Sequence, residues 1–268
     1  MTTLNSELAN AVLSYLRVTP AAPDVTFLDT LMTAYIRRVP WESVSRIAKR
    51  ARTPETAQCP RFAEEFWQSA LENGTGGTCF ESNYAFFALL RSLGYDGYLT
   101  INDMLTTRGC HTAIILNIDG EQWLTDAGYP VHQALRIDAA QATERAGHFH
   151  TYTATPESTN QYRIERDKHP KPYCFTLLNT PVVEPDYRAA TTNDYGEDGL
   201  FLDKVIVTRV VDEQIYRFIY MNSTLMLESF DNSAVRTEQP LGDDAAETVA
   251  QRFDMNPALI AAALQAVP

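Results

Sequence analysis

The chain has 268 residues, 45% of them hydrophobic, which is enough to bury a substantial core in a folded globular protein. Its 34 acidic side chains outnumber its 22 lysines and arginines, and the formal net charge of -12 repels phosphate backbones and anionic membranes. These numbers argue against nucleic acid or a membrane surface as a partner.

The N-terminus and the cysteines argue against other classes of protein. The first ten residues, MTTLNSELAN, are polar, and no run of about 18 apolar residues occurs, so we expect neither a signal peptide nor a membrane span. The cysteines are too widely spaced for a zinc ribbon or a disulfide framework, which favours reduced thiols in a cytoplasmic protein. Three histidines, at 132, 148 and 150, lack acidic or thiol partners at useful spacing, so no metal is expected. The cysteines are Cys59, Cys79, Cys110 and Cys174.

Helical periodicity dominates roughly the first ninety residues. Apolar side chains recur at i, i+3, i+4, i+7 and i+8 from Leu28 to Ile36, and a similar pattern from Phe62 to Leu71 is followed by Asn73-Gly74, a helix stop. A helical bundle is predicted here.

Beyond about residue 97 the sequence favours antiparallel sheet. Short runs rich in Val, Ile, Thr and Tyr, such as HTAIILNI and KVIVTRVV, are separated by Gly, Pro, Asn and Asp. Residues 168–173 and 179–194 are the best candidates for loops. The tail returns to helix, with Asn256-Pro257 as the N-cap and first residue of the last one.

One cysteine stands where a helix is expected to begin, in the sequence GTGGTCFESNYAFFALL. Thr78 and Glu81 fit a capping box, which makes Cys79 the first helical residue. The unpaired N–H groups and the positive end of the helix dipole favour a thiolate there, and Gly76 and Gly77 leave the approach to the sulfur open. Taken alone, a buried inert cysteine remains the commoner explanation.

A hairpin can supply the base that a thiol nucleophile needs. Asp119-Gly120 is a strong two-residue turn signal between two apolar runs, so that Ile118 pairs with Glu121. In that register His111 and Asp126 are diagonal neighbours on one face, with backbone positions about 7–8 Å apart. Cys110 points to the other face, and core packing is favoured for it over a second catalytic thiol.

These features together resemble the arylamine N-acetyltransferase family. Gly-Gly-x-Cys-Phe-Glu-x-Asn at 76–83, His111 opening a strand, and Leu-x-Asp-x-Gly at 124–128 follow the family's pattern and chain order, and VPWESV at 39–44 is similar to its Val-Pro-Phe-Glu-Asn-Leu signature. The resemblance is firm to about residue 130. Four departures stand out: Thr75 replaces an arginine, Trp41 a phenylalanine, Ser43 an asparagine, and Tyr129-Pro130 a Phe-Gly pair.

The resemblance implies an α+β fold with a cysteine-proteinase-like core: a helical domain at 1–95, an antiparallel β-barrel at 96–190 and an α/β lid at 191–268. It makes Cys79 the nucleophile, His111 its base and Asp126 the orienting carboxylate. Acetyl-CoA or another acyl-CoA would be the co-substrate, and an aromatic amine or hydrazine the acceptor, in a ping-pong cycle.

Three alternatives stay open. The first is an amide synthase on the same scaffold, with a longer acyl chain or an acyl carrier protein as donor. The second is a cysteine hydrolase or transglutaminase-like enzyme, because such triads occur there too. The third is a non-catalytic binding protein that keeps the fold. The residues that contact coenzyme A are not predicted.

Overall fold

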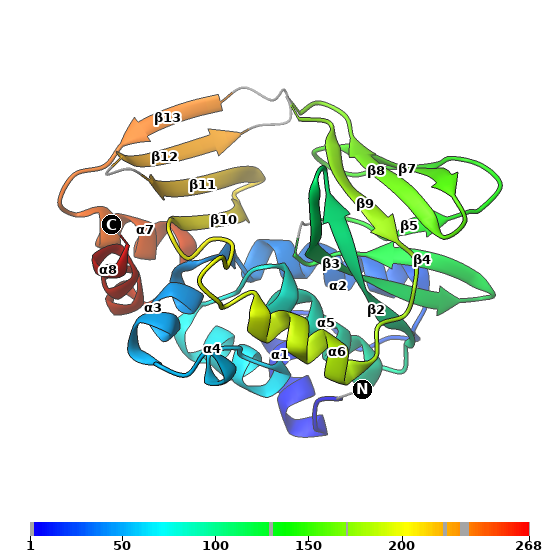
Figure 1. Cartoon of the computed structure of the whole chain (residues 1–268), viewed down its shortest axis with the longest axis horizontal. Coiled ribbons are helices and arrows are strands. Elements are labelled where there is room, and N and C mark those ends of the chain that lie inside the picture. The colour runs from blue at the N-terminus through cyan, green and yellow to red at the C-terminus, as the bar shows by residue number, and fades with distance from the viewer. Residues whose placement is uncertain (1–2, 129–130, 170, 222–223, 231–235, 268) are drawn as a thin grey trace.

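The computed structural model describes residues 3–128, 131–169, 171–221, 224–230 and 236–267. Its N-terminal third is helical, as predicted (Figure 1). The apolar positions of the predicted helix face, Leu28, Leu31, Met32, Tyr35 and Ile36, are all buried, and Gly74 ends a helix with a left-handed φ of 65°. The N-terminal elements are α1 (Ser6–Leu16), α2 (Val25–Arg38), β1 (Trp41–Glu42), α3 (Val44–Arg52), η1 (Thr56–Gln58), α4 (Ala63–Asn73) and α5 (Cys79–Ser92).

An eight-stranded antiparallel sheet follows, in the order β5-β4-β3-β2-β9-β8-β7-β6. Its two edge strands approach each other, and the Arg145 side chain of β6 donates a 2.6 Å hydrogen bond to the carbonyl of Ala134 beside β5, so the sheet is a nearly closed barrel. The strands are β2 (Asp96–Met104), β3 (Thr107–Ile118), β4 (Glu121–Thr125), β5 (Leu135–Ile137), β6 (Thr143–Ala146), β7 (Thr151–Ser158), β8 (Gln161–Arg166) and β9 (Tyr173–Leu178).

A second sheet, ordered β1-β10-β11-β12-β13, joins one short strand from the N-terminal third to four strands near the C-terminus. The two-residue strand β1, just after α2, pairs antiparallel with β10, and α3 packs on α8. Asn256 caps α8 through its side chain, as predicted. The C-terminal elements are β10 (Val205–Val211), β11 (Gln214–Met221), β12 (Thr224–Phe230), β13 (Arg236–Pro240), α7 (Ala245–Phe253) and α8 (Pro257–Ala266).

One predicted loop is wrong. Residues 179–194 contain α6 (Glu184–Asn193), and Pro185 lies in the first turn of this helix. Its Tyr187 is fully buried, so packing against α5 stabilises a helix that the Pro- and Asn-rich composition had concealed. α6 runs across residue 190, where the barrel domain was expected to end. The division of the chain into three domains stays a proposal.

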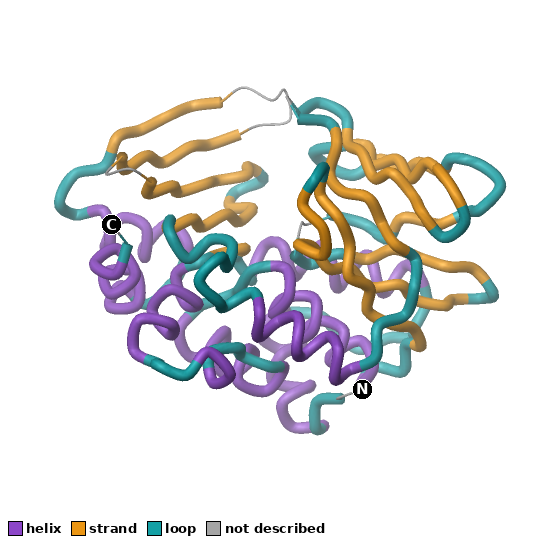
Figure 2. Tube along the Cα trace, viewed as in Figure 1, coloured by secondary structure: helices purple, strands orange, loops and turns teal. Residues whose placement is uncertain are grey.

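The helices form one layer beneath the two sheets (Figure 2). Most buried apolar side chains form a single core that connects α1, α2, α4 and α5 to the barrel, and a smaller one lies between α3, β10, α7 and α8. The predicted α+β class with an antiparallel barrel is confirmed. Within the described residues, no helix is both long and apolar enough to cross a membrane.

Candidate active site

Cys79 is the first residue of α5, as predicted, and only 8% of its surface is exposed. The glycines before it allow a close approach of backbones. A Cβ atom on Gly76 would lie 1.7 Å from the carbonyl oxygen of Pro40, and Gly77 forms a parallel bridge with Trp41. The glycine pair therefore fixes the Cys79 loop against the segment at 39–42, a reason that the sequence did not reveal.

The predicted capping box is wrong. The Thr78 side chain makes no capping hydrogen bond, and its hydroxyl instead accepts one of 3.0 Å from Arg46. Glu81 turns away from the helix end and is ion-paired with Arg61, with 2.5 Å between Nη2 and Oε2. A buried carboxylate gains more from a guanidinium than from a backbone N–H, because both charges would otherwise be buried unpaired.

The predicted hairpin is confirmed. Ile118 pairs with Glu121, and the ladder of β3 and β4 runs in the same register to Ile114 and Thr125. Asp126 follows directly after β4, and its Oδ2 lies 2.7 Å from Nε2 of His111. Both side chains are buried. The hairpin thus brings together the histidine and the carboxylate that the sequence placed on one face.

The surroundings of His111 favour its charged form. Burial alone would lower the pKa, but the charge and hydrogen bond of Asp126 outweigh it, and a hydrogen bond with Cys79 acts in the same direction. The pKa of His111 rises from 6.5 to about 10. The imidazole contacts both the thiol and the carboxylate, and these contacts favour its protonated form.

Asn83 connects the cysteine helix to the carboxylate. It lies one turn after Cys79 in α5, and its amide donates to Asp126 Oδ1 at 3.0 Å and to the carbonyl of Thr112 at 2.6 Å. Its own oxygen accepts a hydrogen bond from the N–H of Ala127. Asn83 belongs to the cysteine motif, and its i+4 spacing puts it on the same helix face as Cys79, but the motif alone does not indicate its role.

Thr112 and Tyr187 form a second connection, which sequence reasoning missed. The Thr112 hydroxyl donates to the carbonyl of Cys79 at 2.9 Å. The Tyr187 hydroxyl, from α6, lies 3.1 Å from that of Thr112 and 2.8 Å from the carbonyl oxygen of Phe80. Because α6 was expected to be a loop, nothing in the sequence pointed to Tyr187.

Of the remaining candidates, Cys110 contacts this cluster through its backbone carbonyl, which lies 3.7 Å from Sγ of Cys79. His132 packs its ring against Phe149, and burial, with the charge of His150, lowers the pKa of His132 to about 3. Cys110 is half-buried rather than packed in the core. In the part of the chain that the structure describes, no three His, Cys, Asp or Glu side chains could together hold a metal ion. The replacement at Tyr129-Pro130 lies outside the described residues.

Two of the other departures from the family pattern, Trp41 and Ser43, lie close to Gly77 and β10. The ring of Trp41 contacts that of Phe201 edge-on, with 4.9 Å between ring centroids. The Ser43 hydroxyl donates to the carbonyl of Lys204 at 2.8 Å and accepts from the N–H of Ile206 at 2.9 Å. Through these two hydrogen bonds Ser43 connects the start of α3 to the second sheet.

Comparison with known proteins places the chain in a family. The profile of the N-acetyltransferase family matches residues 24–260. Arylamine N-acetyltransferase 1 of Felis catus is 24% identical over 197 residues, which cover 63% of this chain and 73% of that protein.

Two solved structures share the fold. The arylamine N-acetyltransferase of Mycobacterium abscessus superposes with a TM-score of 0.78 at 17% identity, over 98% of this chain and 99% of its own. That of Mycobacterium marinum in complex with CoA superposes with a TM-score of 0.79 at 16% identity, over 97% of this chain and 100% of its own. Because the family profile spans most of the sequence, the chain belongs to the N-acetyltransferase family, that of the arylamine N-acetyltransferases, and is an acyltransferase.

Proposed function

We propose that this protein transfers an acetyl or other acyl group from a coenzyme A thioester to an arylamine or hydrazine through a thioester on Cys79. The observation that carries the proposal is the contact of His111 with Asp126 at 2.7 Å and with the Cys79 side chain. The relative from Mycobacterium marinum, which shares the fold, was solved with CoA bound.

In the first half-reaction the Cys79 thiolate attacks the thioester carbonyl carbon. A bond forms between Sγ and that carbon, and the bond from the carbon to the sulfur of coenzyme A breaks. His111, protonated because of its raised pKa, gives its proton to the departing sulfur. The N–H of Cys79 has no acceptor within α5, because it belongs to the first turn, and it donates to the oxyanion.

In the second half-reaction the amine nitrogen attacks the acyl carbon on Cys79. The new bond joins carbon to nitrogen, the bond to Sγ breaks, and the now neutral His111 takes the proton that the amine loses. The thiolate and the imidazolium are restored. Asp126 holds the ring in place through Nε2 and stabilises its charge in both halves.

Steady-state kinetics test the proposal. With acetyl-CoA and an arylamine or hydrazine as the two varied substrates, double-reciprocal plots should be parallel, and each half-reaction should proceed alone. Preference for longer or carrier-borne thioesters would instead favour an amide synthase. Turnover of peptides or glutamine without any thioester would favour a hydrolase or transglutaminase. A protein that turns over none of these substrates would be a binding protein.

A further inference from the structure

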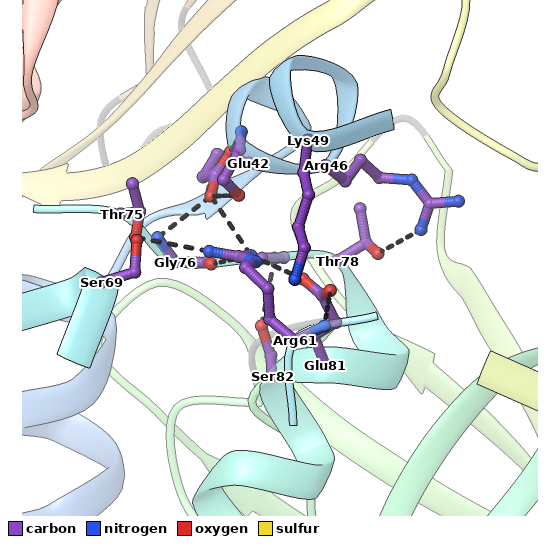
Figure 3. Close-up of polar contacts among 12 residues, drawn as sticks. Glu42, Arg46, Lys49, Arg61, Ser69, Thr75, Gly76, Thr78, Glu81 and Ser82 are labelled. Atoms are coloured by element: carbon purple, nitrogen blue, oxygen red, sulfur yellow. Dashed lines mark hydrogen bonds and ion pairs between the residues drawn. The ribbon is translucent and has the colours of Figure 1, made fainter. Parts of the chain in front are cut away.

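A second buried charge cluster contacts the residues just before and after Cys79 in the sequence, and Arg61 is at its centre (Figure 3). Arg61 precedes α4, and its side chain is 4% exposed. Its Nη2 lies 2.5 Å from Oε2 of Glu81 and 3.9 Å from Oε1 of Glu42, and both carboxylates are fully buried. One guanidinium thus lies between two acidic side chains that have no access to water.

The same guanidinium holds the loop that leads to Cys79. Its Nη2 donates to the carbonyl of Gly76 at 2.7 Å, and its Nη1 lies 3.4 Å from the hydroxyl of Thr75. Glu42 accepts the N–H of Gly76 at 3.1 Å. Both backbone polar groups of Gly76 are therefore bound by this cluster, three residues before the nucleophile.

On the other side of Cys79 the cluster holds the first turn of α5. Glu81 accepts the side chain of Arg61 and also its backbone N–H, at 2.8 Å. The hydroxyl of Tyr195 donates to the same carboxylate. Although burial opposes it, the charge of Arg61 keeps the pKa of Glu81 below its usual value. Arg61 therefore contacts Gly76, which precedes Cys79 in the sequence, and Glu81, which follows it.

Arg46, the other buried guanidinium beside this turn, has a different role. It contacts Thr78 at 3.0 Å and Asp194 at 2.6 Å, and so connects the start of α5 to the end of α6. Among the contacts of the described residues, those of Arg61 alone combine the carbonyl of Gly76 with the carboxylate of Glu81.

We infer that Arg61 is a positioning residue that fixes Cys79 against His111, and that it supplies from outside the cysteine motif the guanidinium that position 75 lacks. This inference rests on the proposed function, because the position of Cys79 matters for catalysis only if Cys79 is the nucleophile. Lysine at 61 keeps the charge but has one donor group in place of a planar fork, so it does not hold Gly76, Thr75 and Glu81 together. A small displacement of the thiol from the imidazole then slows every reaction of the sulfur.

The test compares Arg61→Lys, Arg61→Ala and Arg61→Ala with Thr75→Arg. The readouts are the rate of acetyl loading from acetyl-CoA, the rate of alkylation by iodoacetamide as a function of pH, and thermal unfolding. Arg145→Lys is the matched control, because Arg145 also bridges a carboxylate, Asp29, and a carbonyl, Ala134, without contact with the Cys79 loop.

Arg61→Lys should fold, load acetyl about 10- to 100-fold more slowly, and react more slowly with iodoacetamide with a changed pH profile, because the thiol is displaced from the imidazole. Arg145→Lys should match the wild type in both reactions. Adding Thr75→Arg to Arg61→Ala should restore most of the lost alkylation rate, because the guanidinium returns to the same two carboxylates from the other side. If Arg61→Ala does not fold, the result for Arg61→Lys tests the inference.

A folded Arg61→Lys protein with wild-type loading and an unchanged alkylation profile would overturn the inference, and so would a folded double variant without any recovery. Alkylation needs no thioester. If the wild-type protein did not load acetyl at all, the proposed function would fail, while the alkylation profiles would still decide the role of Arg61.

Discussion

The side-chain amide of Asn83 donates a hydrogen bond of 3.0 Å to the carboxylate of Asp126, so the helix that carries the proposed nucleophile also holds the proposed orienting carboxylate. The N–H of Gly128 donates to the same oxygen at 2.8 Å. The other carboxylate oxygen is then left for His111. Of the three proposed catalytic residues, Cys79 lies in α5, His111 in β3, and Asp126 directly after β4. Asn83 connects the helix of Cys79 to Asp126.

Asn83→Leu should weaken both activity and stability. It removes donors from Asp126 and from the carbonyl of Thr112 in a buried site, and a hydrogen bond to a charged group contributes about 1.5–3 kcal/mol. Denaturant unfolding and acetyl-loading rates measure the two effects. Asn117→Leu is the control, because the side-chain amide of Asn117 donates an exposed hydrogen bond to Asp96, and its loss should change little. Equal effects of the two substitutions would contradict this role of Asn83.

Asp126→Asn should leave the fold intact and slow acyl loading by about two to four orders of magnitude. The amide keeps the shape but removes the negative charge that raises the pKa of His111, so the imidazolium is no longer favoured and the ring is no longer oriented. The pH profile of Cys79 alkylation measures the change, and its midpoint should move. If the profile and the loading rate stayed at wild-type values, Asp126 would not be the orienting carboxylate.

The contribution of His111 to stability should depend on pH with a definite sign. Its pKa is raised on folding, so the folded state binds the proton more tightly, and the stabilisation is complete below pH 6.5 and lost as pH rises toward 10. The difference in unfolding free energy between wild type and His111→Gln should therefore shrink from pH 6 to pH 10. A difference that grew over this range would mean that His111 is not paired as described.

Gly128→Ala should inactivate the protein by displacing Cys79. A Cβ atom at 128 would lie 2.4 Å from Cα and 2.5 Å from Cβ of Cys79, closer than any packing allows. Gly242→Ala is the control, because its nearest neighbour is an Asp244 side-chain oxygen at 3.8 Å. Rates of acetyl loading and unfolding midpoints should separate the two variants. Normal loading by Gly128→Ala would show that the contact with Cys79 is not needed.

The local features of this fold could be predicted because they rest on short-range patterns. The apolar spacing from Leu28 to Ile36 indicated a buried helix face, and Asp119-Gly120 set the register that brings Asp126 to His111. The helix start at Cys79 was also predicted correctly, although the capping box on which that prediction rested does not form.

The errors came from partners distant in sequence. Glu81 does not form the capping box because it pairs with Arg61, which lies 20 residues earlier and is buried beside it. The helix of Tyr187 forms because that ring packs on α5, while its own segment is rich in Pro, Asn and Thr. A two-residue strand such as β1 has no periodicity, and only β10 defines it. None of these three partners can be identified from local sequence.

The identity of the nucleophile is tested most directly by intact-mass measurement after the protein is mixed with acetyl-CoA in the absence of amine. The wild-type protein should gain the mass of one acetyl group, removed again by an arylamine or hydrazine, and peptide mapping should place it on Cys79. Cys79→Ala should gain nothing, whereas Cys174→Ala should behave as wild type, because burial raises the pKa of the Cys174 thiol to about 12. Full, amine-reversible acetylation of Cys79→Ala would contradict the account.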